Sequence, residues 1–174
     1  RENILWWVDI NNCTVFRYDP ETGDNRSYTM PSRVGTVVPR ERGGISVALE
    51  NGFHHCDLES GNIEHVADPE EGRNDNRFND GKCDPAGRFW AGTMTLVGRD
   101  GGGALYCLEA DATVHRRVED ITCSNGICWS HDHRTMFYID TPTRRIDAFD
   151  YAIDTGEIDN RRPVVHVDPE NGAP

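Results

Sequence analysis

A repeated pair of apolar runs constrains the fold of this 174-residue chain more than any other feature. Each unit has a strand-like run, a brief link and a second run that usually ends in Asp before a Gly-containing turn. The first runs of four such units begin near residues 5, 45, 88 and 136, which gives a repeat of about 40–48 residues. This period is typical of propeller blades, which are four-stranded antiparallel sheets arranged around an axis.

The runs have the character of β-strands and not of helices. They are short and bounded by Gly, Asp, Asn and Pro, and no long window shows helical periodicity. We therefore predict an all-β fold, a β-propeller, with about four blades represented. The first runs of the four units should occupy equivalent positions in successive sheets, starting near Leu5, Ile45, Arg88 and Met136. The polar stretch Asp68–Asp75 is expected to be a loop or the outer part of a blade.

Residues 1–174 are predicted to form one β-propeller domain, because this length supports a single core. A propeller closes radially, so its first and last blades must meet. The chain opens almost directly in a strand-like run and has no initiator Met. We therefore expect a propeller domain that is truncated at both ends.

The composition argues against several classes of partner. There are 30 acidic and 18 basic side chains, a formal net charge of -12, whereas nucleic acids and anionic membrane surfaces attract basic faces. No apolar run approaches the roughly 20 residues of a membrane span. The six cysteines form no C-x-x-C pair, so we expect scattered free thiols and a cytoplasmic location.

Two polar segments stand out as possible binding loops. Asn76–Lys82 contains Arg and Asn, which suit a polyhydroxyl ligand, although its Asn-Asp-Gly run is also strong turn chemistry. Cys123–Trp129 contains Asn125, whose side-chain oxygen suits a hard cation such as Ca²⁺ or Mg²⁺. Asn-Gly is equally the commonest tight-turn pair. The residue types alone leave both interpretations open.

Other familiar sites are not indicated. His54 and His55 are adjacent in a predicted strand, so their side chains should point to opposite faces and cannot chelate one metal. The sequence has no G-x-S-x-G serine-hydrolase elbow, P-loop or dinucleotide-binding glycine pattern.

Taken in order, the two polar segments resemble the regucalcin/gluconolactonase (senescence-marker-protein) family of sugar lactonases. The most diagnostic stretch comprises Asn76–Lys82, Asp84–Phe89 and Ala91–Met94. Further matches are Gly103–Tyr106, Ser124–Gly126, Trp129–Ser130, Asp147–Tyr151, Thr155–Gly156 and Asn160–Arg162. The resemblance covers nearly the whole chain. It implies a six-bladed propeller with one divalent cation at the axis and hydrolysis of an aldonolactone to the sugar acid.

The resemblance also implies roles for particular residues. Arg77 and Asn79 match the residues that hold substrate hydroxyls, and Asn125 matches a metal-binding Asn. The family's other two metal ligands are an early Glu and a later Asp, which would lie before Arg1 and beyond Pro174. That Asp is also the expected catalytic base. The implied cation is Ca²⁺, Zn²⁺, Mn²⁺, Mg²⁺ or Fe²⁺, and the oligomeric state is left open.

The implied chemistry agrees with general principles. A divalent cation polarises a lactone carbonyl, and bound donors orient the sugar ring. Two alternatives remain: a calcium-binding regulatory propeller without catalysis, and a related propeller hydrolase of other lactones or phosphotriesters. Thr95–Val97 stand where some relatives carry acidic residues, which leaves the exact lactone open.

Overall fold

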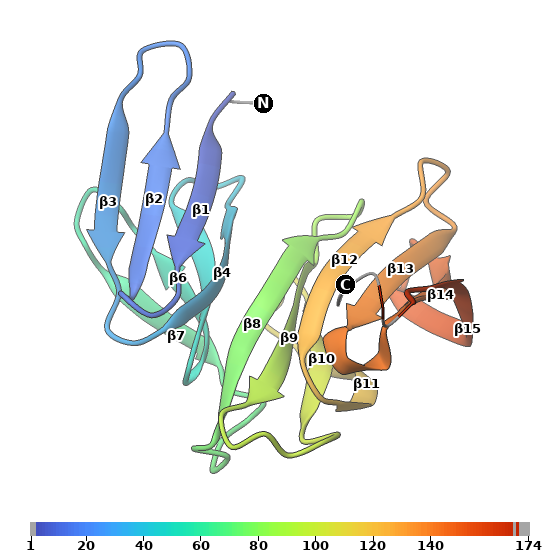
Figure 1. Cartoon of the computed structure of the whole chain (residues 1–174). Coiled ribbons are helices and arrows are strands. Elements are labelled where there is room, and N and C mark those ends of the chain that lie inside the picture. The colour runs from blue at the N-terminus through green and yellow to red at the C-terminus, as the bar shows by residue number, and fades with distance from the viewer. Residues whose placement is uncertain (1–2, 169, 171–174) are drawn as a thin grey trace.

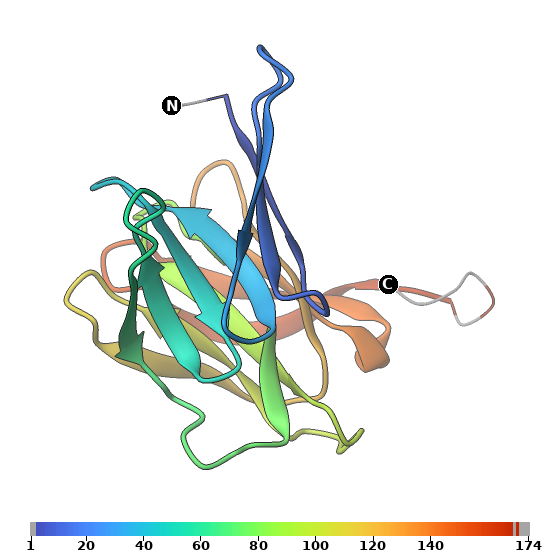
Figure 2. The same ribbon diagram turned by 90° about the vertical axis from the view of Figure 1, so that its left-hand side faces the viewer.

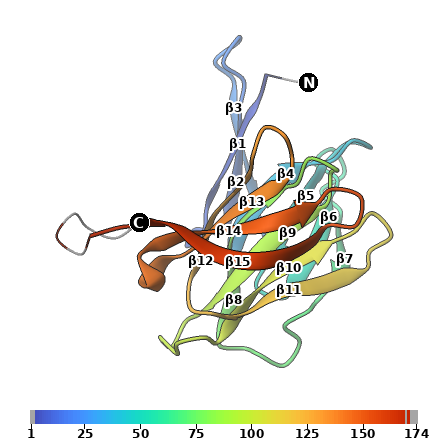
Figure 3. The ribbon, with the colours of Figure 1, turned by 90° about the vertical axis from the view of Figure 1, so that its right-hand side faces the viewer.

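The structure, a computed structural model, describes residues 3–168 and 170. Its strands form four antiparallel sheets that pack against one another in a fan, each sheet being one blade (Figure 1). The first sheet projects at one side of the fan and the last sheet lies at the other (Figures 2 and 3). This arrangement confirms the predicted all-β propeller and the four predicted blades.

The sheets follow the chain in order. The first contains β1 (Leu5–Asp9), β2 (Thr14–Tyr18) and β3 (Asn25–Thr29). The second contains β4 (Val34–Pro39), β5 (Ile45–Leu49), β6 (Gly52–Cys56) and β7 (Ile63–Ala67). The third contains β8 (Asn76–Cys83), β9 (Phe89–Thr95), β10 (Gly103–Leu108) and β11 (Val114–Ile121). The fourth contains β12 (Ser124–Trp129), β13 (Thr135–Asp140), β14 (Arg145–Ala152) and β15 (Glu157–His166), with the short 3₁₀ helix η1 (Thr141–Thr143) after β13.

The repeat predicted from the sequence matches the sheet order. Strands β5, β9 and β13 are each the second strand of a four-stranded sheet, and β1 begins the three-stranded sheet. These are the strands expected to be equivalent. The first strands of the four-stranded sheets, β4, β8 and β12, lie next to one another across the sheet boundaries, as β8 and β12 do in Figure 1. We call these three the inner strands.

The prediction that the two polar segments are loops was wrong. Asn76–Lys82 lies within β8, and all of Cys123–Trp129 except its first residue forms β12. The turn-like sequences are accommodated as β-bulges: the pairing of β8 with β9 shifts register between Phe78 and Gly81. A polar stretch can therefore continue as a strand, because its extra residues are left out of the ladder. Asp68–Asp75, by contrast, connects β7 to β8 as expected.

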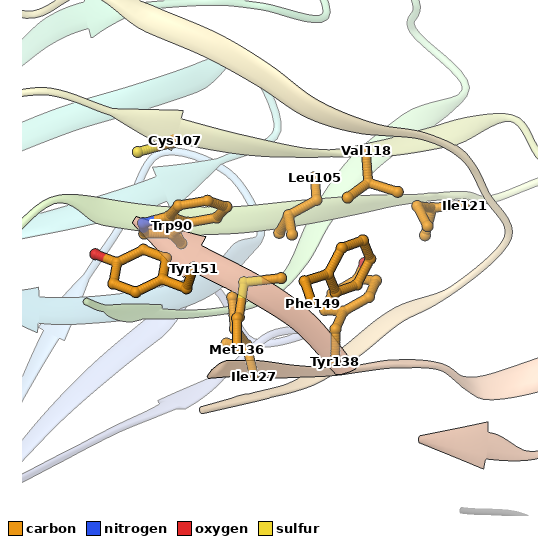
Figure 4. Close-up of a cluster of buried hydrophobic side chains, with 10 residues drawn as sticks. All are labelled: Trp90, Leu105, Cys107, Val118, Ile121, Ile127, Met136, Tyr138, Phe149 and Tyr151. Carbon is orange, nitrogen blue, oxygen red and sulfur yellow. The ribbon is translucent and has the colours of Figure 1, made fainter. Parts of the chain in front are cut away.

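Apolar packing between neighbouring sheets forms three cores. The core between the third and fourth sheets includes Trp90 from β9 and Tyr138 and Phe149 from the fourth sheet (Figure 4). Every residue of β5 and of β10 is buried, because neighbouring sheets cover both faces of these middle strands. Outer strands such as β15 are largely exposed.

A buried carboxylate joins the third and fourth sheets at the carboxyl end of β8. Asp84 Oδ2 accepts hydrogen bonds from Trp90 Nε1 at 3.0 Å and from the Tyr151 hydroxyl at 2.7 Å. Burial and the nearby Asp84 carboxylate raise the pKa of Tyr151, so its hydroxyl stays a donor. This network fixes the two sheets at the end of β8 remote from its first residue.

The expectations for histidine and cysteine also hold. His54 packs against His65 with ring centroids 5.0 Å apart, whereas His55 Nδ1 lies 3.0 Å from the Ser46 hydroxyl. The adjacent histidines therefore point to different surroundings. All six cysteines are free thiols. Within the described residues, no helix is long and apolar enough to cross a membrane.

Replacing Gly35 by Ala should destabilise the protein by about 1–3 kcal/mol. A Cβ at this position on β4 would lie 2.5 Å from the Phe78 carbonyl carbon and oxygen and 2.8 Å from Asn79 N, all of them backbone atoms of β8. Urea unfolding followed by tryptophan fluorescence measures the change. The control, Ser27→Ala on exposed β3, should alter the unfolding free energy by less than about 0.5 kcal/mol. Equal midpoints for the two variants would contradict this account.

Stability should fall as the pH decreases through about 6.5, in part because of His54. Burial lowers the pKa of His54 from the value of 6.5, although a hydrogen bond with Gly52 O opposes the shift. Between the lowered pKa and 6.5 the unfolded chain binds a proton that the folded state does not, which favours unfolding. Urea midpoints at about pH 7.5 and 5.5 measure the loss. His54→Gln should reduce this loss, whereas His115→Gln, at an exposed position of β11, should not.

Candidate functional site

Arg77 lies at the amino end of β8 and holds a half-buried guanidinium group. Its Nη1 donates to Phe78 O and to Asn79 Oδ1, each at 2.9 Å. Burial lowers the pKa of Arg77, but an Arg side chain remains charged at neutral pH. In the described part of the chain, Nε and Nη2 have no hydrogen-bond partner. These N–H groups are therefore available to a polar ligand.

Asn79 connects the third sheet to the fourth. Its Oδ1 accepts from Arg77, and its Nδ2 donates to Ser124 O at 2.7 Å. Ser124 directly precedes Asn125, so the amide of Asn79 reaches the start of β12 across the sheet boundary. Arg77 and Asn79 thus touch one another, and Asn79 touches the residue before Asn125.

All three inner strands carry a register shift near their amino ends. The shifts lie between Val34 and Thr36 in β4, within Phe78–Gly81 in β8, and between Asn125 and Ile127 in β12. Bulges are over-represented next to active sites, where they redirect a side chain. Asn79 lies inside one bulge and Asn125 beside another. The predicted site residues are therefore placed where the inner strands depart from regular pairing.

Asn125 offers one ligand oxygen. Its Nδ2 donates to the Thr141 hydroxyl at 3.0 Å, and its Oδ1 has no hydrogen-bond partner among the described residues. A neutral amide oxygen is a suitable ligand for a hard divalent cation. The described residues contain no group of three or more His, Cys, Asp or Glu that could hold a metal ion. The described residues thus present the Asn125 oxygen as a fitting cation ligand but not a complete metal centre.

The remaining expected ligands do not fall within the described structure. The Glu and the Asp expected from the resemblance would lie outside the 174 residues. The terminal run Gly172–Pro174, which resembles the approach to that Asp, lies outside the described residues.

The residues that support Asn125 were not predicted from the sequence. Asp140 is buried, and its carboxylate accepts from Cys123 N at 2.8 Å and from Thr122 N at 3.1 Å. The Tyr138 hydroxyl donates to Ser124 Oγ at 2.7 Å. Both contacts hold the turn that leads into β12. The available signal was an Asp at the end of the apolar run that begins at Met136, and in the structure this Asp accepts hydrogen bonds from a neighbouring turn.

A sulfur-rich contact lies beside Arg77. Met94 is the direct partner of Arg77 in the pairing of β8 with β9, and it also bridges to Cys123. The two sulfur atoms are 3.8 Å apart. Burial raises the pKa of Cys123, which keeps it a neutral thiol. The surroundings of Arg77 therefore combine polar amides on one side with a soft, weakly polar contact on the other.

A separate cleft lies between the first and second sheets. It is lined by charged side chains of both signs, including Arg17, Asp19, Arg26 and Arg40. None of the predicted site residues lines it. The candidate site is therefore defined by contacts among the inner strands and not by this cleft.

Comparison with known proteins identifies the family. The sequence model of the SMP-30/gluconolactonase/LRE-like region matches residues 1–174. The chain belongs to this family. The family resemblance seen in the sequence is thereby confirmed.

Individual relatives of this SMP-30/gluconolactonase family member agree with the assignment. The chain is 37% identical over 179 residues to regucalcin of Xenopus laevis, covering 100% of this chain and 60% of that protein. It is 34% identical over 170 residues to the putative sugar lactone lactonase YvrE of Bacillus subtilis, covering 98% of this chain and 58% of that protein. The chain therefore spans about 60% of the length of these relatives.

A solved structure supports the same assignment. The calcium-binding protein regucalcin of Agrobacterium tumefaciens superposes with a TM-score of 0.86 at 25% identity. The superposition covers 94% of this chain and 55% of that one. The fold of the SMP-30/gluconolactonase family member described here is thus shared by a protein that its description calls calcium-binding.

The 174-residue chain alone should bind divalent cations weakly, with Kd above about 1 mM. A single neutral oxygen from Asn125 does not compete with water for an ion that takes six or more oxygen ligands. Isothermal titration calorimetry with Ca²⁺, Zn²⁺ and Mn²⁺ measures the affinity. Asn125→Ala serves as the control. Its Kd should also lie above about 1 mM, because the unchanged chain already binds the cation weakly. Micromolar affinity that survives in Asn125→Ala would point to other ligands, such as Asp80.

Proposed function

We propose that the protein containing this chain hydrolyses a sugar lactone, such as gluconolactone, to the sugar acid with the help of one divalent cation. Family membership and the similarity to a putative sugar lactone lactonase support the reaction class. The observation that carries the proposal is the chain of contacts from Arg77 through Asn79 to Ser124, the residue before Asn125. It joins a hydrogen-bonding group for a polyhydroxyl ring to a free amide oxygen for a cation.

Arg77 and Asn79 would bind and orient the sugar. The free N–H groups on Nε and Nη2 of Arg77 can donate to two ring hydroxyls. Asn79 holds the guanidinium through Oδ1 and is itself held by Ser124 O, so the donors are positioned before substrate arrives. Holding the ring in one orientation favours reaction at the carbonyl carbon because less freedom is lost at the transition state.

Asn125 would be one ligand of the cation. When bound, a divalent cation acts as a Lewis acid toward the lactone carbonyl. Because Asn125 is neutral, it leaves more of the positive charge available than a carboxylate ligand would. The Asp expected beyond Pro174 is proposed as the base that takes a proton from the attacking water.

A second candidate is calcium binding without catalysis. The similar Agrobacterium protein is described as calcium-binding, which favours this candidate. Turnover of gluconolactone by the full-length protein with added Ca²⁺, Zn²⁺, Mn²⁺, Mg²⁺ or Fe²⁺ separates the two functions. A panel that adds larger lactones and phosphotriesters tests the related hydrolases in the same assay. Calcium affinity without turnover of any substrate would favour the regulatory candidate.

In the full-length protein, Arg77→Ala or Asn79→Ala should lower kcat/KM for gluconolactone about 5- to 150-fold. This range corresponds to the loss of about 1–3 kcal/mol from one neutral or charged hydrogen bond. A pH-drop assay measures the rate, and thermal unfolding shows that each variant remains folded.

Lys82→Ala is the matched control, because Lys82 is an exposed cation at the other end of β8. It should retain wild-type kcat/KM. If Arg77→Ala and Asn79→Ala lowered only the melting temperature, with normal activity per folded molecule, the segment would be structural and its proposed role in binding would be wrong.

A further inference from the structure

A second buried carboxylate packs against the third sheet near the candidate site. Glu70 belongs to the connection between β7 and β8, and its side chain is only 4% exposed. Its Oε1 accepts from the Tyr106 hydroxyl at 2.7 Å and from Thr93 Oγ1 at 3.0 Å. Its Oε2 accepts from Asn76 Nδ2 at 2.8 Å. Glu70 thus ties the β7–β8 connection to β8, β9 and β10.

Glu70 Oε2 also lies 3.6 Å from Arg73 Nη1, so the buried charge has an ionic partner, but a carboxylate is not required here for stability alone. Removing a charge from water costs several kcal/mol, and a well-packed apolar side chain is often as stabilising as a buried charged group. The carboxylate adds directional hydrogen bonds, because Oε1 accepts from Tyr106 and Thr93 while Oε2 accepts from Asn76. Burial and the Glu70 carboxylate raise the pKa of Tyr106, so this donor stays protonated.

The contacts of Asn76 lead from Glu70 to the site. Asn76 is the first residue of β8 and directly precedes Arg77. Besides its bond to Glu70, its Nδ2 donates to Gly102 O at 2.8 Å, and its backbone N donates to Arg73 O at 2.9 Å. These three bonds fix the point at which β8 begins.

Successive side chains of β8 point to opposite faces of the sheet, so Asn76 and its neighbour Arg77 have different surroundings. Asn76 is buried, whereas Arg77, the next residue, is half-buried and reaches Asn79 beside the fourth sheet. Within the described residues, Glu70 makes no hydrogen bond or ion pair with Arg77, so any influence passes through the Asn76 backbone. A shift at Asn76 would tilt the long Arg77 side chain and move its free N–H groups away from a ligand.

We infer that Glu70 is a positioning residue for Arg77: by holding the Asn76 amide at the start of β8, it sets the direction of the guanidinium group. This inference rests on the proposed lactonase function only for its effect on substrate binding. Its structural part, the orientation of Arg77, is measurable without any substrate.

The test compares Glu70→Gln with Asp84→Asn in the full-length protein. Both substitutions neutralise a buried carboxylate that packs against the third sheet and accepts from a tyrosine hydroxyl, but Asp84 lies at the other end of β8. The gluconolactone KM and kcat are measured, together with the NMR signal of Arg77 Nε–H in the ligand-free protein. Glu70→Gln should shift this signal and raise KM on the order of tenfold, with little change in kcat. Asp84→Asn should lower the unfolding midpoint and leave the Arg77 signal and KM unchanged.

Asn76→Ser provides a second route if Glu70→Gln does not fold. It removes the amide link but keeps Glu70 and its bonds to Thr93 and Tyr106, and it should shift the Arg77 signal in the same way. An Arg77 signal unchanged in the folded variants would overturn the inference. A second outcome separates this inference from the proposed function. If Glu70→Gln shifts the Arg77 signal without changing KM, and Arg77→Ala is also fully active, Glu70 positions Arg77 but Arg77 does not bind the substrate.

Discussion

Apolar contact between the faces of neighbouring sheets is the interaction on which the rest of this structure depends. The three cores lie at the three sheet boundaries, so each sheet is stabilised chiefly by its neighbours. The packing brings strands of neighbouring sheets so close that Gly35 of β4 lies against the Phe78 backbone and Gly92 of β9 lies against the Ser124 side chain. Because the strands approach this closely, side chains on different sheets can bond directly, as Asn79 bonds to Ser124 O.

Buried carboxylates in a connection and at the ends of strands complement the apolar cores. Glu70, Asp84 and Asp140 each accept from several hydrogen-bond donors in connections or neighbouring strands. Their charges are costly to bury, and the hydrogen bonds they accept are directional. The cores therefore hold the sheets together, whereas the carboxylates determine how the connecting segments enter and leave them.

The sequence predicted the sheets better than it predicted the inner strands. Apolar runs at a regular period identified the equivalent strands β5, β9 and β13, because their burial leaves a clear pattern. Strands β8 and β12 were assigned to loops, because Asn-Asp-Gly and Asn-Gly favour turns locally and only pairing with a distant strand shows that they form bulges.

In the candidate site, too, sequence motifs indicated the individual residues but not the contacts between residues far apart in the chain. Arg77, Asn79 and Asn125 were selected by family resemblance, whereas the bond from Asn79 to Ser124 joins residues 45 positions apart and has no local signature. Glu70 was overlooked because the polar run around it has the composition of a solvent-exposed loop. Only the fold shows that this carboxylate is buried among Thr93, Tyr106 and Asn76.

The glycines at the sheet boundaries determine which mutations can alter the distance between neighbouring sheets. Where Gly35 meets the Phe78 backbone, the separation of β4 and β8 is limited by main-chain atoms and not by the size of any side chain. Exchanges among the large apolar residues of the cores thus alter how tightly the blades adhere while preserving the distance between the inner strands. The stability of the blades and the spacing of the inner strands can accordingly be altered by different sets of mutations, because the first depends on apolar side chains and the second on backbone contact at a glycine.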